Sequence, residues 1–436
     1  MSRRAALRGL TLATLLGGGA GAGLAFAGGP QRAEASDATR PGEGEVLELD
    51  LAFFEARIAR DRSAARDHAE LARLYLERAR LSGTPDADLA RAEEHARRSL
   101  ALRTAHNREA LQVLASSLMG RHRFAEARDA AERLLASDSG SRSSRALLGE
   151  IQLELGDYEA AAGTFGTLLT VRRDLAVAPR YARWEEIRGR PSEARKLLRA
   201  ALDQASSRHG MPRSQLAWFR WRLGDLALRV GRVDEAESEL QEGLALAPED
   251  HRLLDGLARV AAARHRWREA IELGERALAK AVDPGTLGLL SLSYAMLGDS
   301  ARSAEYERAM ATAVRDGPET LHRAWSLYLL DHGREVPAVL AAAREEIRVR
   351  RDVYGWDLLG WALYRAGAID EALVASSNAL ATNTRDAALY FHAGTIAAAA
   401  GRTGLARRRL EQALAINPRW HPTQPREACA LLERLR

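Results

Sequence analysis

The 436-residue chain has one cysteine, Cys429, and only two lysines, Lys196 and Lys280. A single cysteine excludes an internal disulfide framework and any zinc site with two or more cysteine ligands. We expect Cys429 to be a small buried hydrophobic residue. Proline is scarce too, with 13 residues, which excludes a proline-rich fibre. Because 46% of the residues are hydrophobic, the chain can fold, and its length favours several domains or a repeat array.

The charge of the chain is close to balance, with a formal net charge of +5. Nearly all basic residues are arginine, which stays charged at any relevant pH. Removal of residues 1–35, predicted below to be a signal segment, would lower the net charge by three, since that segment holds four arginines and Glu34. Charge therefore gives no reason to expect a nucleic-acid partner.

The N-terminal 35 residues differ from the rest of the chain. Arg3 and Arg4 precede an uncharged stretch over 9–31 that is rich in Gly, Ala and Leu, and Ala33-Glu34-Ala35 follows. A basic start, an apolar stretch and a small-x-small site are typical of an export signal, here cleaved before Ser36. The start resembles a twin-arginine signal, although Ala6 stands where those signals usually carry an aromatic residue, so ordinary secretion stays open. We expect a periplasmic or extracellular protein.

An uncleaved membrane anchor is the alternative for residues 9–31, because about 20 apolar residues can span a bilayer. The sequence therefore predicts contact with a membrane only through this segment.

A 34-residue period organises the remaining chain. Gly333, Gly367 and Gly401 are 34 residues apart, and an alanine follows each of them five residues later. Upstream, Trp356-x-x-Leu-Gly-x-x-Leu363 is matched 34 residues later by Tyr390-x-x-Ala-Gly-x-x-Ala397. This pattern resembles the tetratricopeptide repeat, a helix–turn–helix unit. One such hairpin cannot bury its apolar face alone, so the units stack. The resemblance implies an all-α fold, a right-handed α-solenoid of about ten stacked units.

The repeats divide the chain into segments with the following expected boundaries. We predict the signal over 1–35, a flexible tether over 36–45, an N-terminal capping helix over 46–66, repeats over 67–208, an extended connection over 209–216, repeats over 217–420 and a C-terminal capping helix over 421–436.

The resemblance also implies which residues contact a partner. In the family, defined positions of each first helix face the concave side of the solenoid, where aromatic and arginine side chains anchor interfaces. In this chain we expect those solvent-facing positions to hold Arg183, Trp218, Trp221, Arg222, Asp225, Arg259, Arg323, Tyr354, Asp357, Trp361, Tyr364, Phe391 and His392. Packing between first helices is the alternative for Trp218 and Trp361, and interhelix ion pairing is the alternative for the arginines and aspartates.

One further cluster, Arg348-Val-Arg350-Arg351-Asp352-Val-Tyr354, ends one unit and opens the next. It could bind a carboxylate or phosphate through two hydrogen bonds, or it could be a solvated turn with a salt-bridged helix end.

The sequence shows no pattern that points to catalysis. It lacks G-x-S-x-G, H-E-x-x-H, a Walker-type glycine loop and G-x-G-x-x-G, and its histidines are scattered. We therefore predict no enzyme activity, no catalytic residue, no cofactor and no metal.

The expected function is an exported scaffold or adaptor that binds a protein or peptide in its concave groove, with a homo-oligomer as an open possibility. A carbohydrate- or cell-wall-binding accessory protein is the alternative, because stacked Trp and Tyr rings also bind sugars.

Overall fold

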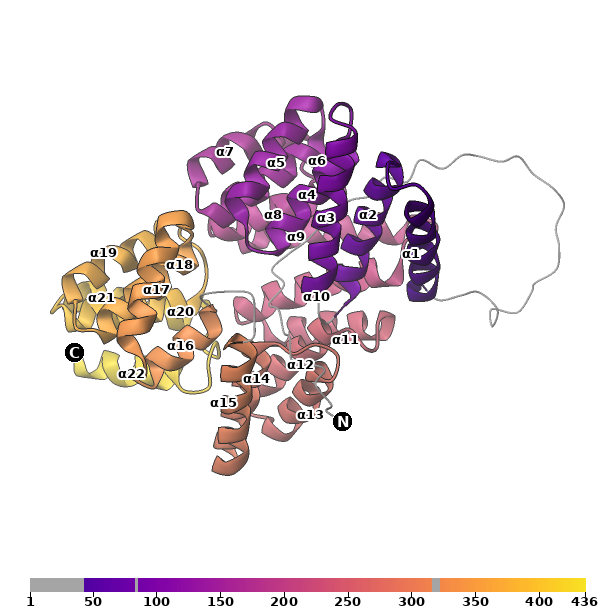
Figure 1. Ribbon diagram of the computed structural model, residues 1–436. Coiled ribbons are helices and arrows are strands. Elements are labelled where there is room, and N and C mark those ends of the chain that lie inside the picture. Colours follow the sequence, from indigo (N-terminus) through magenta and orange to yellow (C-terminus); the bar gives the residue numbers. More distant parts are fainter. Residues whose placement is uncertain (1–42, 83–84, 316–321) are drawn as a thin grey trace.

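A computed structural model describes residues 43–82, 85–315 and 322–436 of the chain, so the predicted signal over 1–35 lies outside the described residues. Over the described ranges the chain forms 22 α-helices and one short 3₁₀ helix, with no strand (Figure 1). The all-α solenoid predicted from the repeat period is confirmed.

Ten consecutive helical hairpins make up the array between α1 (Glu43–Arg60) and α22 (Gln424–Arg434). Their first helices are α2 (Ala65–Leu81), α4 (Arg108–Gly120), α6 (Arg142–Leu155), α8 (Ala178–Ile187), α10 (Arg213–Arg229), α12 (His251–Ala263), α14 (Pro284–Met296), α16 (Arg323–Asp331), α18 (Val353–Arg365) and α20 (Ala387–Ala399). Their second helices are α3 (Asp86–Leu102), α5 (Phe124–Ser137), α7 (Tyr158–Gly166), α9 (Pro191–Ser206), α11 (Val233–Leu246), α13 (Trp267–Leu278), α15 (Ser300–Arg315), α17 (Val336–Val349), α19 (Ile369–Ala379) and α21 (Thr403–Ile416).

Local signals fix where the first helices begin. The carboxylates of Asp250, Asp283, Asp352 and Asp386 each accept a hydrogen bond from a backbone N–H two or three residues further on, at 2.6–3.1 Å. Such a cap satisfies one of the unpaired N–H groups at a helix start and stabilises the helix by about 1 kcal/mol.

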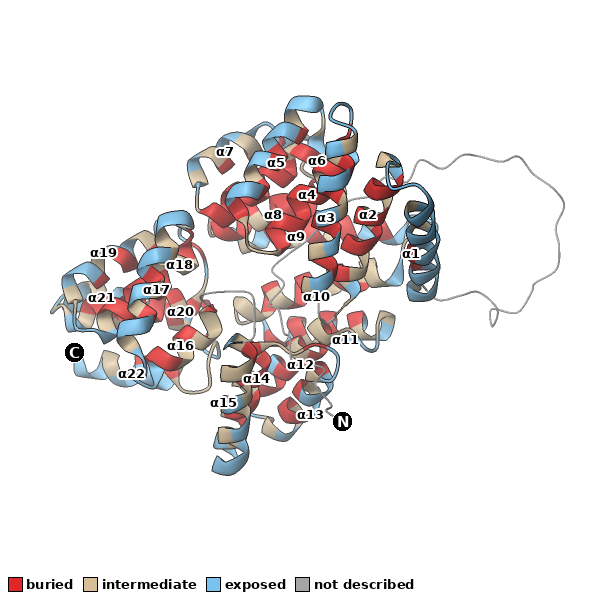
Figure 2. Cartoon of the chain, in the orientation of Figure 1, coloured by how far each residue is buried: buried red, intermediate tan, exposed pale blue. Residues whose placement is uncertain are grey.

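Small residues let the two helices of a hairpin pack closely. A Cβ added at Gly224 of α10 would lie 2.5 Å from Cγ of Leu240 in α11, and one at Gly394 of α20 would lie 2.7 Å from Cγ of Leu410 in α21. No real Cβ makes such contacts, so the leucine occupies the space that a side chain would need. The buried residues accordingly lie between the paired helices and between neighbouring hairpins (Figure 2).

Several helix bounds lie a few residues from the predicted segment boundaries. Helix α1 starts at Glu43, inside the segment expected to be a tether, and ends at Arg60. Helix α10 starts at Arg213, so its first turn occupies the second half of the segment predicted to be an extended connection. Cys429 on α22 is exposed, so our expectation that it would be buried is wrong.

The array curves until two of its parts, far apart in sequence, meet. The turn after α6 in the third hairpin lies against the residues before α18 in the ninth, and the turn after α8 in the fourth lies against those before α20 in the tenth. The turn after α10 in the fifth lies against Asn417, after α21. We call this set of three contacts the inter-turn seam.

Hydrogen bonds at the seam satisfy the carbonyl groups that end the first helices. The backbone N–H of Arg351 donates to the oxygen of Leu155 at 2.9 Å. The hydroxyl of Thr384 donates to the oxygen of Ile187 at 2.6 Å, and the side-chain amide of Asn417 donates to the oxygen of Leu228 at 2.9 Å. The last carbonyls of a helix have no partner within the helix, so Arg351 and Thr384 supply missing donors, while Asn417 is a second donor to an oxygen that also accepts from the N–H of Gly231.

Candidate partner-binding cavity

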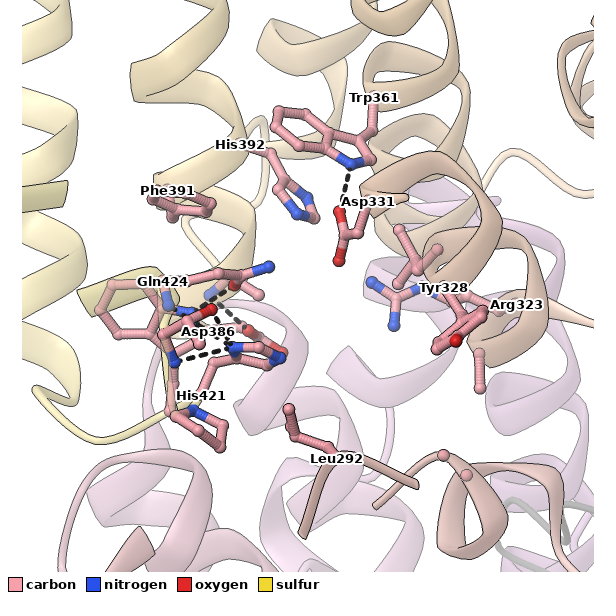
Figure 3. A pocket seen from close by; sticks show the side chains of 18 of the residues that line it. Leu292, Arg323, Tyr328, Asp331, Trp361, Asp386, Phe391, His392, His421 and Gln424 are labelled. Carbon is pink, nitrogen blue, oxygen red and sulfur yellow. Dashed lines mark hydrogen bonds between the residues drawn. The ribbon is translucent and has the colours of Figure 1, made fainter. Parts of the chain in front are cut away.

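The concave side of the curved array holds a partly open cavity of about 1670 Å³. Residues from the first helices α10 to α20, from α22 and from the loop before α22 line most of it (Figure 3). Among the predicted partner-binding residues, the cavity is lined by Arg183, Asp225, Arg259, Arg323, Tyr354, Trp361, Tyr364, Phe391 and His392.

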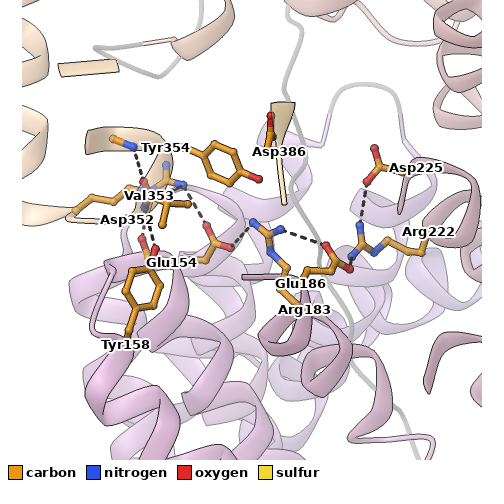
Figure 4. A network of polar contacts seen from close by, with 12 residues as sticks. Glu154, Tyr158, Arg183, Glu186, Arg222, Asp225, Asp352, Val353, Tyr354 and Asp386 are labelled. Atoms are coloured by element: carbon orange, nitrogen blue, oxygen red, sulfur yellow. Dashed lines mark hydrogen bonds and ion pairs between the residues drawn. The ribbon is translucent and has the colours of Figure 1, made fainter. Parts of the chain in front are cut away.

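A chain of ion pairs crosses the first helices on one side of the cavity (Figure 4). Arg183 lies between Glu154 at 3.9 Å and Glu186 at 3.3 Å. Arg222 donates to the other oxygen of Glu186 at 2.5 Å and lies 3.3 Å from Asp225. We call this chain of Glu154, Arg183, Glu186, Arg222, Asp225 and Arg229 the charged wall; all of these residues except Glu186 and Arg222 line the cavity. Its three acidic and three basic side chains neutralise one another.

The far end of the charged wall contacts the later hairpins. Arg229 pairs with Asp225 at 2.9 Å and donates to the hydroxyl of Tyr354 on α18 at 2.8 Å. Burial alone would raise the pKa of Asp225, but Arg229 and Arg222 outweigh burial and lower it. Asp225 is therefore ionised at neutral pH.

The expected anion-binding cluster around Arg350 has its partner within this chain. The guanidinium of Arg350 lies 3.1 Å from Glu154 and 2.6 Å from Asp352. The hydroxyl of Tyr158 accepts a hydrogen bond from the N–H of Val353 at 2.8 Å. The carboxylate that Arg350 binds is thus Glu154, across the inter-turn seam.

Aromatic side chains gather on the opposite side of the cavity. We call Tyr328, Trp361, Tyr364, Phe391 and Trp420 the aromatic wall. The ring of Trp361 stacks on Tyr364 with centroids 4.9 Å apart and on His392 at 4.3 Å, and its indole N–H donates to Asp331 at 2.8 Å.

A buried polar cluster supports the aromatic wall. Asp357 accepts from Nδ1 of His392 at 2.8 Å and from Arg323 at 2.9 Å. Burial favours the neutral acid, but His392 and Arg323 outweigh it and hold the pKa of Asp357 below its ordinary value. This cluster fixes the ring of His392 beneath Trp361.

His421, in the loop before α22, lies in the floor of the cavity (Figure 3). Its Nδ1 faces the backbone N–H groups of Thr423 at 3.2 Å and Gln424 at 3.4 Å, so the proton of the neutral ring is on Nε2. Burial lowers the pKa of His421 to about 4. The ring is therefore neutral at pH 7.

Several predicted residues are not solvent-facing, which corrects the sequence-based expectation. Arg222, Trp218, Asp357, Trp361, Phe391 and His392 are all buried, with 2–6% of their surface exposed. Trp218 packs edge-to-face on Phe219 and does not line the cavity, and neither do Trp221, Arg222 and Asp357. Trp218 and Trp361 are packed against other side chains, as the first alternative expected. The charged residues form ion pairs, as the second alternative expected.

The sequence did not identify Trp420, His421, Gln424, Tyr328, Asp331 and Asp386 as lining residues. Trp420 and His421 follow the last hairpin, where no repeat position assigns them to the concave side. In the part of the chain that the structure describes, no three potential ligands among His, Cys, Asp and Glu come together to hold a metal ion. Among the same residues, no helix is long and apolar enough to cross a bilayer.

Two family models of the tetratricopeptide repeat match the chain, over residues 113–173 and 187–260. These matches confirm the resemblance for those two segments, which extend from α4 to α12. No curated protein matches the chain.

The solved structures similar to this chain include a chain of the APC/C hetero-tetramer Cut9-Hcn1, at 14% identity and a TM-score of 0.34, over 90% of this chain and 93% of that one. They also include YrrB, described as a TPR protein with an unusual peptide-binding site, at 16% identity and a TM-score of 0.21, over 49% of this chain and 92% of that one.

Proposed function

We propose that this protein is a non-catalytic scaffold that holds a polypeptide segment in its central cavity. The size of the cavity carries this proposal. Pockets for small molecules usually have volumes of about 300–1,000 Å³. The cavity of about 1670 Å³ exceeds that range and suits a longer ligand.

The chemistry of the two walls supports a polypeptide rather than a densely charged polymer. The charged wall is already neutralised by its own ion pairs, so it has little excess charge to offer an anionic chain. The aromatic wall offers the partly exposed rings of Tyr364, Tyr328 and Trp420, which suit apolar and aromatic side chains of a partner.

The alternative of a carbohydrate ligand has less support. A sugar ring stacks on an open aromatic face, but Trp361 is only 5% exposed and its ring is stacked on Tyr364 and His392. Binding of the purified protein to a glycan array, without enrichment of peptides, would favour the carbohydrate function instead.

Selection of short random peptides on the immobilised protein tests the proposal. We expect enriched peptides whose affinity falls roughly tenfold or more in Tyr364→Ala and Trp420→Ala, because both rings line the cavity. Phe53→Ala is the matched control, since Phe53 is an exposed aromatic residue on α1 outside the cavity. Circular dichroism checks that all three variants keep their helix content. No enriched peptide, or equal loss of affinity in the control, would contradict the proposal.

We also propose that the protein works outside the cytoplasm, on the basis of the residues before Ser36. N-terminal sequencing of the protein purified from its native envelope fraction should begin at Ser36. Retention of residues 9–31 in the membrane fraction would favour the anchor instead. Replacement of Arg3 and Arg4 by lysine separates twin-arginine export, which it should block, from general secretion, which it should leave intact.

A further inference from the structure

The inter-turn seam determines how a ligand can reach the cavity. In a curved stack of hairpins, neighbouring first helices pack side by side and form a continuous wall. Among the described residues, one place where this wall can have a gap is where one turn of the array passes the next. At that place the turns after α6, α8 and α10 contact the residues before α18, before α20 and at Asn417. The seam therefore closes the side of the cavity along the third to fifth hairpins.

The seam is closed by backbone atoms, so side-chain rotation cannot open it. A Cβ added at Gly156 would lie closer than 3.0 Å to the backbone of Arg351, and one at Gly189 would meet the carbonyl oxygen of Asn383. Backbones this close leave no gap for a polypeptide to pass between them.

An apolar cluster and an ion pair add to the closure. Ile187 from the first part of the array packs with Val353 and Leu389 from the second, and each is at most 2% exposed. Next to them, Arg350 bridges Glu154 and Asp352. Opening the seam would expose this apolar surface and separate buried charges, which disfavours sideways entry.

From this closure we infer that the cavity admits its polypeptide end-first, along the axis of the superhelix. The inference rests on the proposed function and specifies the partner. The partner is an unfolded segment that ends in a free terminus, not a loop held between two folded domains. A folded domain is much larger than the cavity and does not fit inside it.

The aromatic wall also limits the chemistry of this terminus. Trp420 and His421 on the floor and Tyr364 on α18 present rings, and His421 is neutral because burial lowers its pKa. A terminal segment with apolar and aromatic side chains fits these surfaces better than one with many charges.

Association kinetics of the full protein with two fusions test the inference. The probe is the peptide enriched in the selection above, fused to one folded domain at one end or to folded domains at both ends through equal linkers. We expect the doubly fused peptide to associate at least roughly 100-fold more slowly than the singly fused one. Equal association rates for the two fusions would overturn end-first entry and leave the proposed function intact. Absence of binding by either fusion would overturn both.

Two glycine variants then test whether the seam is the barrier. Gly189→Ala should force the seam apart and raise the association rate of the doubly fused peptide towards that of the singly fused one. Gly367→Ala is the matched control, because Gly367 has the same left-handed backbone conformation at the same repeat position but nothing lies within 4 Å of its added Cβ. The inference is supported if Gly189→Ala keeps its helix content but binds the doubly fused and the singly fused peptide at similar rates. If Gly189→Ala still binds the doubly fused peptide as slowly as Gly367→Ala does, the inference is overturned. The comparison of the two fusions on the wild-type protein tests the inference without any variant.

Discussion

Gly156 and Arg351 are 195 residues apart in sequence, yet their backbones pack so closely that a side chain on Gly156 has no space. The N–H of Arg351 donates to the carbonyl oxygen of Leu155, the residue before Gly156. This contact belongs to the inter-turn seam, which joins two turns of the curved array beside the cavity.

The first prediction concerns Gly156 and its counterpart Gly367. Both have positive φ, 77° and 82°, so alanine at either position costs about 1–2 kcal/mol of stability for the left-handed conformation. Gly156→Ala should cost more and should open the seam, since its Cβ meets the backbone of Arg351. Urea denaturation measures the loss of stability, and small-angle X-ray scattering should show a larger radius of gyration only for Gly156→Ala. Equal radii for the two variants would mean that the seam stays closed.

The second prediction concerns the ion pairs of the seam. Arg350→Met removes the closer cation from Glu154, which keeps only Arg183 at 3.9 Å, and the paired cation from the buried carboxylate of Asp352, so we expect a loss of about 3–5 kcal/mol. Arg344→Met is the control, because Arg344 pairs with Glu371 where both side chains are more than half exposed, and its loss should stay below about 1 kcal/mol. Chemical denaturation of both variants measures the difference. Similar losses would show that the seam pair contributes no more than a surface pair.

The third prediction is a pH dependence of stability that His421 causes. Its pKa is about 4 in the folded protein, whereas the ordinary pKa of a histidine, which applies to the unfolded chain, is 6.5. Between these values only the unfolded chain binds the proton, so the free energy of unfolding falls as the pH drops from about 6.5 to 4. The full effect is about 3 kcal/mol at most.

Denaturant titrations across that pH range, with wild type and His421→Gln, measure the effect of His421. The glutamine can still accept from the backbone N–H groups but does not titrate, so its profile should be flatter. His209→Gln, at an exposed position, is the control and should follow the wild type. A variant profile as steep as that of the wild type would exclude His421 as the cause.

The fourth prediction concerns the support beneath the aromatic wall. Asp357→Asn removes the negative charge of the carboxylate that accepts hydrogen bonds from His392 and Arg323. We expect the free energy of unfolding to fall by about 2–3 kcal/mol at pH 7. Because those partners lower the pKa of Asp357, its stabilising effect is present above the unfolded pKa and disappears as the pH falls through the folded value.

The matched control for this change is Asp203→Asn on the exposed side of α9, expected to stay within about 0.5 kcal/mol. Tryptophan fluorescence should also change in Asp357→Asn, since Trp361 stacks on His392. An unchanged stability and spectrum would show that the ion pair is dispensable.

The sequence by itself determined the hairpin array. The 34-residue spacing of Gly333, Gly367 and Gly401 places a left-handed turn at the same point of each unit, and all three glycines have positive φ. Helix periodicity, turn glycines and small residues at close approaches act over one repeat and its neighbour, so they can be seen in a single sequence. The concave positions that the resemblance to the repeat family implied also include nine of the residues that line the cavity.

Only the tertiary structure decided the seam and which side chains remain accessible. The curvature of the array is the sum of small rotations at each hairpin, and no local pattern fixes that sum. Gly156 and Gly367 therefore occupy the same repeat position, but only Gly156 meets a second turn of the chain. In the same way, Trp361 occupies a predicted concave position but is buried by Tyr364 and His392. Contacts between hairpins six units apart depend on the geometry of every unit between them.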